Sequence, residues 1–82
     1  MKYYAAYGTY TARFGTYIVV ARSLADAHSK LDQMVQKKLP VSIKYNTLVR
    51  VWEGEQLYIE DIEQKKVDYY TRLTNDVYFF EE

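Results

Sequence analysis

The chain has 82 residues, no cysteine, and equal numbers of basic and acidic side chains, eleven of each. The length predicts a single domain spanning residues 1–82. The absence of cysteine excludes disulfides, thiolate zinc sites and a cysteine nucleophile. No apolar run approaches the roughly 20 residues that cross a bilayer, so we expect a soluble, cytoplasmic protein without membrane contact.

Charge is unevenly distributed along the chain. Residues 1–52 carry eight basic and two acidic side chains, whereas residues 53–82 carry three basic and nine acidic ones. If the fold keeps these halves apart, the protein has a basic and an acidic side, which steers partners or favours self-association. The ten tyrosines are the second unusual feature. Aromatic residues favour strands and are useful at binding surfaces.

The first 21 residues predict a β-hairpin. Residues 2–12 alternate between two faces that are both fairly apolar, and Gly8 indicates a bulge or the close approach of another backbone. Arg13–Gly15 is expected to form the turn, with Gly15 at a positive φ. The β-branched run Tyr17–Ala21 predicts a central strand that is buried on both faces.

A helix is predicted over Ser23–Lys38. Ser23 is a suitable N-cap, and Asp26 is favourable near the positive end of the helix. Pro40 is expected to push Leu39 out of helical geometry. Apolar residues recur at three- and four-residue spacing and predict one buried stripe, formed by Leu24, Ala27, His28, Leu31, Met34 and Val35. For His28, the only histidine, packing in this stripe is favoured over a pH-sensitive contact.

The remaining chain predicts further strands. Val41–Trp52 alternates strictly, with Asn46–Thr47 as a point of interruption that would split off a short first piece. Glu53–Glu55 is a hairpin signal followed by a return strand over Gln56–Asp61. Residues 57–73 leave short strands and a second helix open, with strands favoured, and Val77–Phe80 predicts a last strand. The fold class is therefore α+β, an antiparallel sheet of about five strands (β-hairpin, one helix, β-meander) with a single helix packed on one face.

No motif for catalysis, cofactor binding or metal binding is present, so we expect a protein that is not an enzyme. The three glycines form no phosphate-binding loop. An acidic cluster surrounds the predicted second hairpin, but its spacing matches no calcium loop, and a solvated hairpin is the favoured interpretation. Its members are Glu53, Glu55, Glu60, Asp61 and Glu63.

We expect the sheet face opposite the helix to be open to water or a partner. The leading hypothesis is a non-catalytic interaction module, in character with phage or mobile-element accessory or inhibitor-like proteins, that binds a larger protein or forms a homodimer. The alternative is a single-strand nucleic-acid binder, with aromatic rings stacking on bases and cations following phosphates. The candidate partner-binding residues are Tyr4, Tyr10, Tyr17, Arg50, Trp52, Tyr58, Glu53, Glu55, Glu60 and Asp61; the cations of the alternative are Lys2, Arg13, Arg22, Lys44 and Arg50.

Overall fold

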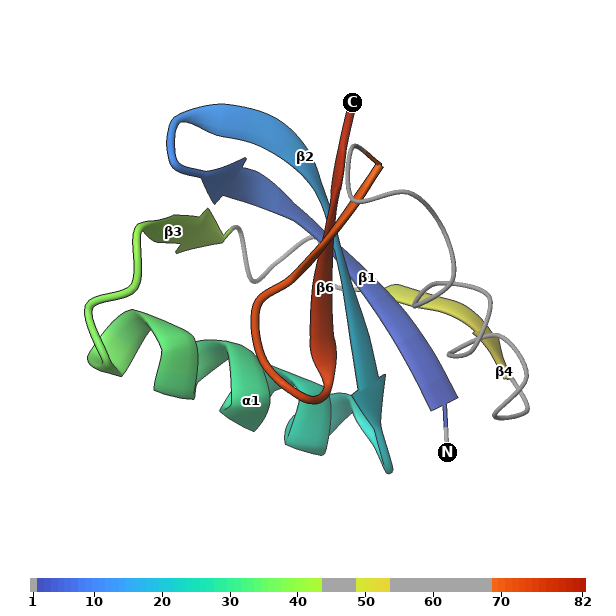
Figure 1. Ribbon diagram of the computed structural model, residues 1–82. Helices are drawn as coiled ribbons and strands as arrows, with labels where there is room; N and C mark the ends of the chain where they lie inside the picture. The colour runs from blue at the N-terminus through green and yellow to red at the C-terminus, as the bar shows by residue number, and fades with distance from the viewer. Residues whose placement is uncertain (1, 44–48, 54–68) are drawn as a thin grey trace.

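The computed structural model describes residues 2–43, 49–53 and 69–82, and these form one α+β unit in which a helix crosses an antiparallel sheet (Figure 1). The predicted fold class is confirmed: the described residues contain one helix, packed on one face of the sheet. In chain order the elements are β1 (Lys2–Tyr10), β2 (Arg13–Ala21), α1 (Leu24–Gln36), β3 (Val41–Ile43), β4 (Val49–Glu53), β5 (Tyr70–Arg72) and β6 (Val77–Glu81).

The sheet is five strands wide, in the order β3-β1-β2-β6-β5, and β4 also pairs with β1. β3 pairs with residues 8–10 of β1 and β4 with residues 2–5, so the two strands share one edge. Gly8 of β1 pairs with Ile43 of β3, and Ala5 of β1 pairs with Val49 of β4. These two pairs are three residues apart in β1 but six residues apart in the chain that runs from β3 to β4. Ile43 and Val49, predicted to share a face, therefore pair with residues of β1 that project to opposite faces, so one continuous alternation over Val41–Trp52 is wrong. The predicted splitting off of a short first piece is confirmed, because β3 and β4 are separate strands.

The β1–β2 hairpin is confirmed, but its turn lies two residues earlier than predicted. Tyr10 pairs with Arg13, and the two residues between them, Thr11 and Ala12, have φ of 51° and 63°. Positive φ at both central positions defines a turn that matches the right-handed twist of the strands. Gly15, predicted to supply a positive φ in the turn, is instead buried within β2.

Gly8 and Gly15 face each other in the register, and each is required by a close backbone. A Cβ at Gly8 would lie 1.9 Å from the carbonyl oxygen of Ser42 in β3. A Cβ at Gly15 would lie 2.2 Å from the carbonyl oxygen of Phe80 in β6. The close approach predicted at Gly8 is confirmed. The absence of a side chain at Gly8 and at Gly15 allows β3 and β6 to approach the hairpin closely.

The helix begins as predicted and ends two residues early. The Ser23 hydroxyl accepts from the Asp26 amide at 3.1 Å, and an Asp26 carboxylate oxygen accepts from the Arg22 amide at 3.0 Å. At the other end Lys38 has φ of 56°, its amide donates to Val35, and the Leu39 amide donates to Met34. These two bonds form a Schellman motif, which ends the helix before Pro40 acts.

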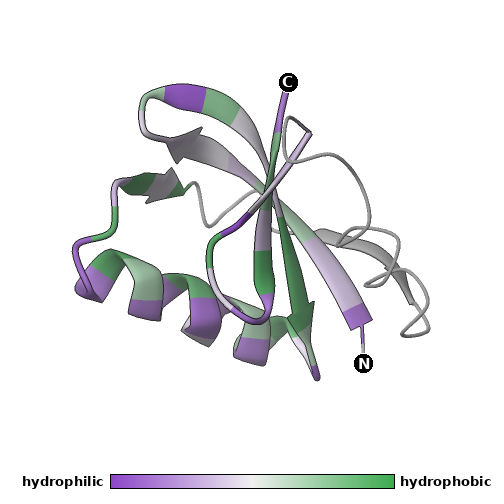
Figure 2. Ribbon diagram, viewed as in Figure 1, coloured by the Kyte–Doolittle hydropathy of each residue, from purple (hydrophilic) through white to green (hydrophobic). Residues whose placement is uncertain are grey.

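The buried stripe of α1 is narrower than predicted and consists of Ala27, Leu31 and Met34. Leu24 and Val35, assigned to the stripe, are exposed, and His28 is half-buried. Figure 2 shows hydrophilic residues along the side of α1 that is turned away from the sheet. The helix packs on a cluster from three strands, formed by Tyr4, Ala6, Tyr17, Val19, Ala21, Val77 and Phe79.

The opposite face of the sheet is only partly open, which corrects the expectation of a bare face. Tyr3, Ile18, Val20 and Tyr78 form a second buried cluster there, with Tyr70 packed against it. Large aromatic and β-branched side chains from β1, β2 and β6 are thus buried on this side as well. The open part of this face lies toward the β1–β2 turn.

Candidate functional site

A transverse row of side chains crosses four strands on the face opposite the helix. Tyr7 pairs with Thr16, Thr16 with Phe80, and Phe80 with Tyr70. Residues paired directly across antiparallel strands project to the same face. Phe14 lies two residues before Thr16 in β2 and therefore projects to this face too. We call Tyr7, Phe14, Thr16, Tyr70 and Phe80 the aromatic surface.

The rings of the aromatic surface contact one another and remain accessible. Tyr7 and Phe14 stack with centroids 6.4 Å apart and planes within 2°. Tyr70 and Phe80 contact at 5.2 Å in a tilted arrangement. Tyr7 and Phe14 are 42% and 49% exposed, whereas Phe80 and Tyr70 are half-buried. A stacked, exposed pair beside half-buried rings is an apolar patch with fixed geometry, a common feature of binding sites.

A carboxylate borders these rings. The Glu82 amide donates to the Phe14 carbonyl at 3.2 Å, which extends the β2–β6 pairing by one residue. The Thr16 hydroxyl donates to Glu82 Oε1 at 3.1 Å. This bond holds the Glu82 carboxylate on the face that carries the aromatic rings. The neighbouring Glu81 alternates away from this face and pairs with Arg13 at 3.1 Å.

Several predicted binding residues lie elsewhere. Tyr4 and Tyr17 are 4% and 0% exposed in the core beneath α1, so their assignment to an open face is wrong. They project to the helix side because they alternate with Tyr3 and Ile18, which project to the other. The Tyr17 hydroxyl donates to the Thr9 carbonyl, and burial, with a smaller effect of Tyr10, raises the pKa of Tyr17 to about 12.

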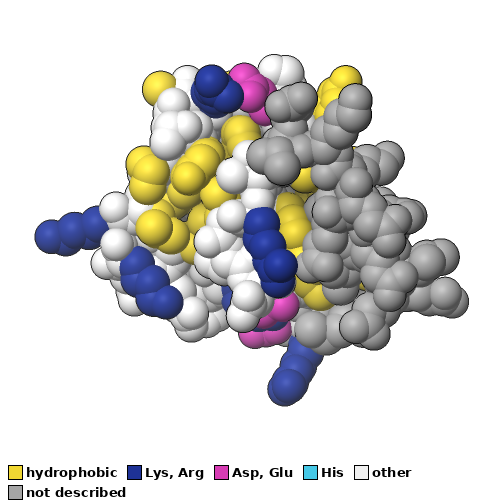
Figure 3. All heavy atoms as spheres, in the orientation of Figure 1, with side chains coloured by type: hydrophobic (Ala, Val, Ile, Leu, Met, Phe, Trp, Pro, Cys, Tyr) yellow, Lys and Arg dark blue, Asp and Glu magenta, His cyan; other side chains and the backbone are white. Residues whose placement is uncertain are grey.

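Tyr10 is half-buried and also on the helix side, where its ring lies 5.8 Å from that of Phe79. Figure 3 shows hydrophobic side chains gathered between the β1–β2 hairpin, β3 and β6. The half-buried residues that border the core beneath α1 are Tyr10, Val41, Ile43 and Leu73. Tyr10 thus belongs to the margin of the main core.

Of the predicted binding residues from Arg50 onward, the structure describes only some. Arg50, Trp52 and Glu53 belong to β4, where their backbones pair with Tyr4, Tyr3 and Lys2. The predictions for Tyr58, Glu55, Glu60 and Asp61, the return strand over Gln56–Asp61 and the choice between strand and helix before residue 69 lie outside the described residues. Residues 57–73 were predicted to form either short strands or a second helix, and Tyr70–Arg72, within this range, is a strand.

The cations of the nucleic-acid hypothesis whose side chains are described, Lys2, Arg13 and Arg22, do not gather at the aromatic surface; Lys44 lies outside the described residues, and only the backbone of Arg50 is described. Arg13 and Arg22 stand at the two ends of β2, about 30 Å apart for nine residues of strand. Arg13 is paired with Glu81, and Lys2 lies at the far end of β1 from the turn. These three basic residues therefore do not line the aromatic surface as one groove.

Reasoning from the sequence missed all five members of the aromatic surface. The position of the turn could have indicated two of them. With Thr11 and Ala12 at the tip of the hairpin, Tyr7 and Phe14 project to the same face. The contribution of Phe80 and Tyr70 depends on β6 pairing with β2, and the paired residues Thr16 and Phe80 are 64 apart in the chain. No local pattern specifies that contact.

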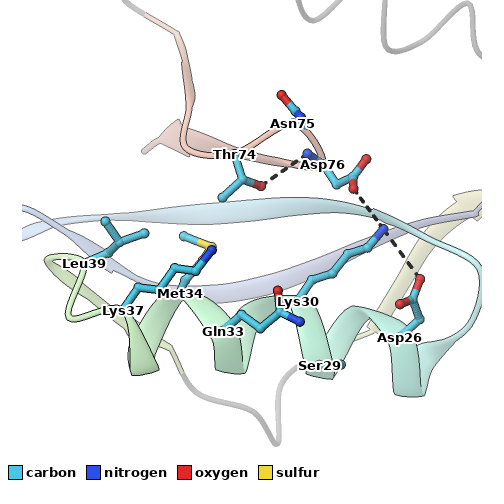
Figure 4. A pocket seen from close by; sticks show the side chains of 10 residues that line it. All are labelled: Asp26, Ser29, Lys30, Gln33, Met34, Lys37, Leu39, Thr74, Asn75 and Asp76. Atoms are coloured by element: carbon cyan, nitrogen blue, oxygen red, sulfur yellow. Dashed lines mark hydrogen bonds and ion pairs between the residues drawn. The ribbon is translucent and has the colours of Figure 1, made fainter.

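A polar pocket lies between α1 and the turn that connects β5 to β6 (Figure 4). Its volume is about 300 Å³. Lys30 reaches along its floor, and its ammonium group lies 2.6 Å from the Val20 carbonyl oxygen, 3.2 Å from an Asp76 carboxylate oxygen and 3.5 Å from one of Asp26. The lining residues are Asp26, Ser29, Lys30, Gln33, Met34, Lys37, Leu39, Thr74, Asn75 and Asp76.

The electrostatics of the pocket indicate a structural role. The Lys30 ammonium group donates a hydrogen bond to the Val20 carbonyl and forms ion pairs with Asp26 and Asp76, so its charge is already balanced within the protein. The Arg22 amide, and to a smaller extent Lys30, lower the pKa of the Asp26 carboxyl, partly offset by desolvation. Lys30 thus joins the helix to the end of β2 and to the β5–β6 turn.

Among the described residues, no group of three or more His, Cys, Asp or Glu side chains is placed to hold a metal ion. Within the same ranges, no helix has the length and apolarity needed to cross a membrane. No protein-family model, curated protein or solved structure matches this chain. The aromatic surface is therefore the one feature of the described residues that points to a function.

Proposed function

We propose that this chain is a non-catalytic interaction module that binds a larger protein, or a second copy of itself, through the aromatic surface. The observation that supports the proposal is the stacked pair Tyr7 and Phe14, 42% and 49% exposed on the β1–β2 hairpin. Aromatic anchors on regular elements lose little conformational entropy on binding, and they contribute strongly to interface energies.

The size of the surface favours a compact contact. Two half-exposed rings and two half-buried ones offer on the order of 250 Å² of ring area, since a fully buried aromatic side chain contributes 150–250 Å². A stable dimer buries about 800 Å² per partner. The aromatic surface therefore fits the centre of an interface, where one or two partner side chains insert, with further contacts at its rim.

The test is affinity capture from lysate of the source cells, with and without nuclease, followed by binding measurements on the purified partner. The variant Tyr7→Ser/Phe14→Ser removes the stacked pair, and Tyr69→Ser, at a 57% exposed ring outside the aromatic surface, is the matched control. We expect the double variant to lose the partner, by tenfold or more in Kd, while the control retains it. Equal binding by both variants would refute the proposal.

Self-association is tested with the same proteins by sedimentation equilibrium. If the partner is a second copy, the wild type and Tyr69→Ser form a concentration-dependent dimer and the double variant is monomeric. The circular dichroism spectra of all three proteins should coincide, because the substituted rings are exposed.

Single-strand nucleic-acid binding remains the second candidate, because aromatic rings in a row across a sheet suit base stacking. The Glu82 carboxylate beside Phe14 opposes it, since it would lie near the phosphates. Fluorescence anisotropy of labelled oligothymidylate at 20 mM and 200 mM salt tests this candidate. Binding that weakens steeply with salt and depends on Phe14 would favour it.

A further inference from the structure

We infer that the aromatic surface receives a cationic side chain, an arginine of a protein partner, between the Tyr7–Phe14 stack and the Glu82 carboxylate. This inference rests on the proposed function and names the chemistry of the partner at that same surface. The observation behind it is the position of Glu82, which the Thr16 hydroxyl holds on the side of the sheet that carries the rings.

The register brings the carboxylate next to the rings. The Glu82 amide bonds to the Phe14 carbonyl at 3.2 Å, so the two residues are cross-strand neighbours whose Cβ atoms are about 4.5–5.5 Å apart. Phe14 is stacked on Tyr7, and Phe80 in β6 lies two residues before Glu82, which directly follows that strand. The carboxylate therefore has aromatic rings on both sides.

This combination favours a guanidinium group over other ligands. The faces of aromatic rings attract cations, and arginine stacks on rings through its planar group. A carboxylate accepts a guanidinium through two parallel bonds, and it has room for about four hydrogen bonds, of which Thr16 supplies one to Oε1. An anionic ligand would meet Glu82 at the edge of the rings and be repelled.

Glu81, the residue before Glu82, provides a control for the effect of a negative charge at this position. It carries the same charge and is next in sequence, but it projects to the other face and is paired with Arg13. A general effect of negative charge in β6 would respond equally to substitution at either position. A site made by Glu82 and the rings responds only to Glu82.

The experiment is a titration of the full chain followed by ¹H–¹⁵N correlation spectra. The probe is acetyl-Gly-Arg-Gly-amide, compared with the same peptide containing citrulline, the neutral isostere of arginine, and with oligothymidylate. We expect the arginine peptide to shift the amide resonances of Tyr7, Phe14, Thr16 and Glu82 in a saturable way. The citrulline peptide should bind about five- to tenfold more weakly, because cation–π and ion-pair contributions are both lost.

The variants separate this inference from the proposed function. Glu82→Gln should weaken the arginine peptide by about two- to fivefold, and Glu81→Gln should leave it unchanged. Equal binding of the arginine and citrulline peptides, no effect of Glu82→Gln, or tighter binding of oligothymidylate at the same resonances would overturn the inference. If the captured partner depends on Phe14 but not on Glu82, the proposed function stands and this inference is wrong. If the peptide requires Glu82 while capture is unaffected by loss of Tyr7 and Phe14, the surface binds a free guanidinium group but no partner, and both the proposed function and the partner arginine are wrong.

Discussion

Replacement of Lys30 by Met should strongly destabilise the fold, because Lys30 connects three separate parts of the chain. Its ammonium group donates to the Val20 carbonyl at 2.6 Å and lies within 3.5 Å of the Asp26 and Asp76 carboxylates. Methionine retains most of the aliphatic volume, so the change removes the charge and its bonds rather than the packing. The substitution therefore isolates the electrostatic contribution of this contact.

The expected loss is about 2–3 kcal/mol in the free energy of unfolding. A hydrogen bond from a charged donor contributes about 1.5–3 kcal/mol, and its loss leaves the carbonyl of Val20 without this partner. Each ion pair adds only about 0.2–1 kcal/mol, because the Asp26 and Asp76 side chains are 34% and 44% exposed. For a domain of this size the loss corresponds to roughly 10–20 °C in Tm.

Urea denaturation followed by far-ultraviolet circular dichroism gives this free energy. The matched control is Lys37→Met, an exposed lysine that lines the same pocket, which should stay within about 0.5 kcal/mol of the wild type. A double-mutant cycle with Asp76→Asn should give a coupling energy of about 0.5–1 kcal/mol. If Lys30→Met matches Lys37→Met, the contact is not stabilising and the reasoning fails.

Acid provides an independent check of the same contact. The folded state lowers the pKa of Asp26, first through the Arg22 amide and then through Lys30. A lowered pKa contributes stability that is present above the ordinary carboxyl pKa and lost as pH falls through the lowered value. Asp26→Asn should therefore reduce the stability at pH 7 and flatten its decline in acid. A decline as steep as in the wild type would contradict this assignment.

Three further substitutions test the backbone and the core. Gly8→Ala should cost at least about 2 kcal/mol in urea denaturation, since its Cβ would lie 1.9 Å from the Ser42 oxygen; a neutral result would contradict the close approach. Lys38→Gly should stabilise by about 0.5–1 kcal/mol in a thermal melt, because Lys38 ends the helix at φ of 56°; destabilisation would refute strain there. Burial raises the pKa of Tyr17 to about 12. The contribution of this side chain to the free energy of unfolding is therefore fully present below about pH 10 and is lost between about pH 10 and 12. Tyr17→Phe should make this alkaline decline smaller, leaving the contribution of Tyr3, whose pKa burial also raises; a decline as steep as in the wild type would exclude Tyr17 as a cause.

Local signals predicted the elements well. Ser23 caps α1 through the Asp26 amide, as its residue type suggests, and the hairpin and the last strand follow the β-formers of the sequence. Such features depend on residues within a few positions of one another. The helix end was less predictable, since Lys38 occupies a conformation that usually selects glycine.

The candidate site was less predictable, because it depends on which face of the sheet each side chain projects to and on the pairing of strands that are far apart in the sequence. Both faces of β1 carry tyrosines, and only the packing of α1 decides that Tyr4 is buried beneath the helix and Tyr7 is exposed opposite it. Gly15 suggested a later turn, whereas its small size is needed for the approach of Phe80. Residue type alone did not distinguish these two uses of glycine.

The spatial order of the strands changes the meaning of the uneven charge. β1–β4, from the basic part of the chain apart from Glu53, lie together, and β5 and β6, from the acidic part, lie on the other side of β2. The boundary falls between β2 and β6, where Thr16 and Glu82 meet across 66 residues of sequence. A carboxylate from the acidic part thus stands among aromatic rings of the basic part. The linear pattern of cations and tyrosines suggests a phosphate ligand, but the folded arrangement gives those rings an acidic neighbour. The acidic neighbour favours an arginine-bearing protein partner over nucleic acid, and a comparison of Glu82→Gln with Glu81→Gln tests this preference directly.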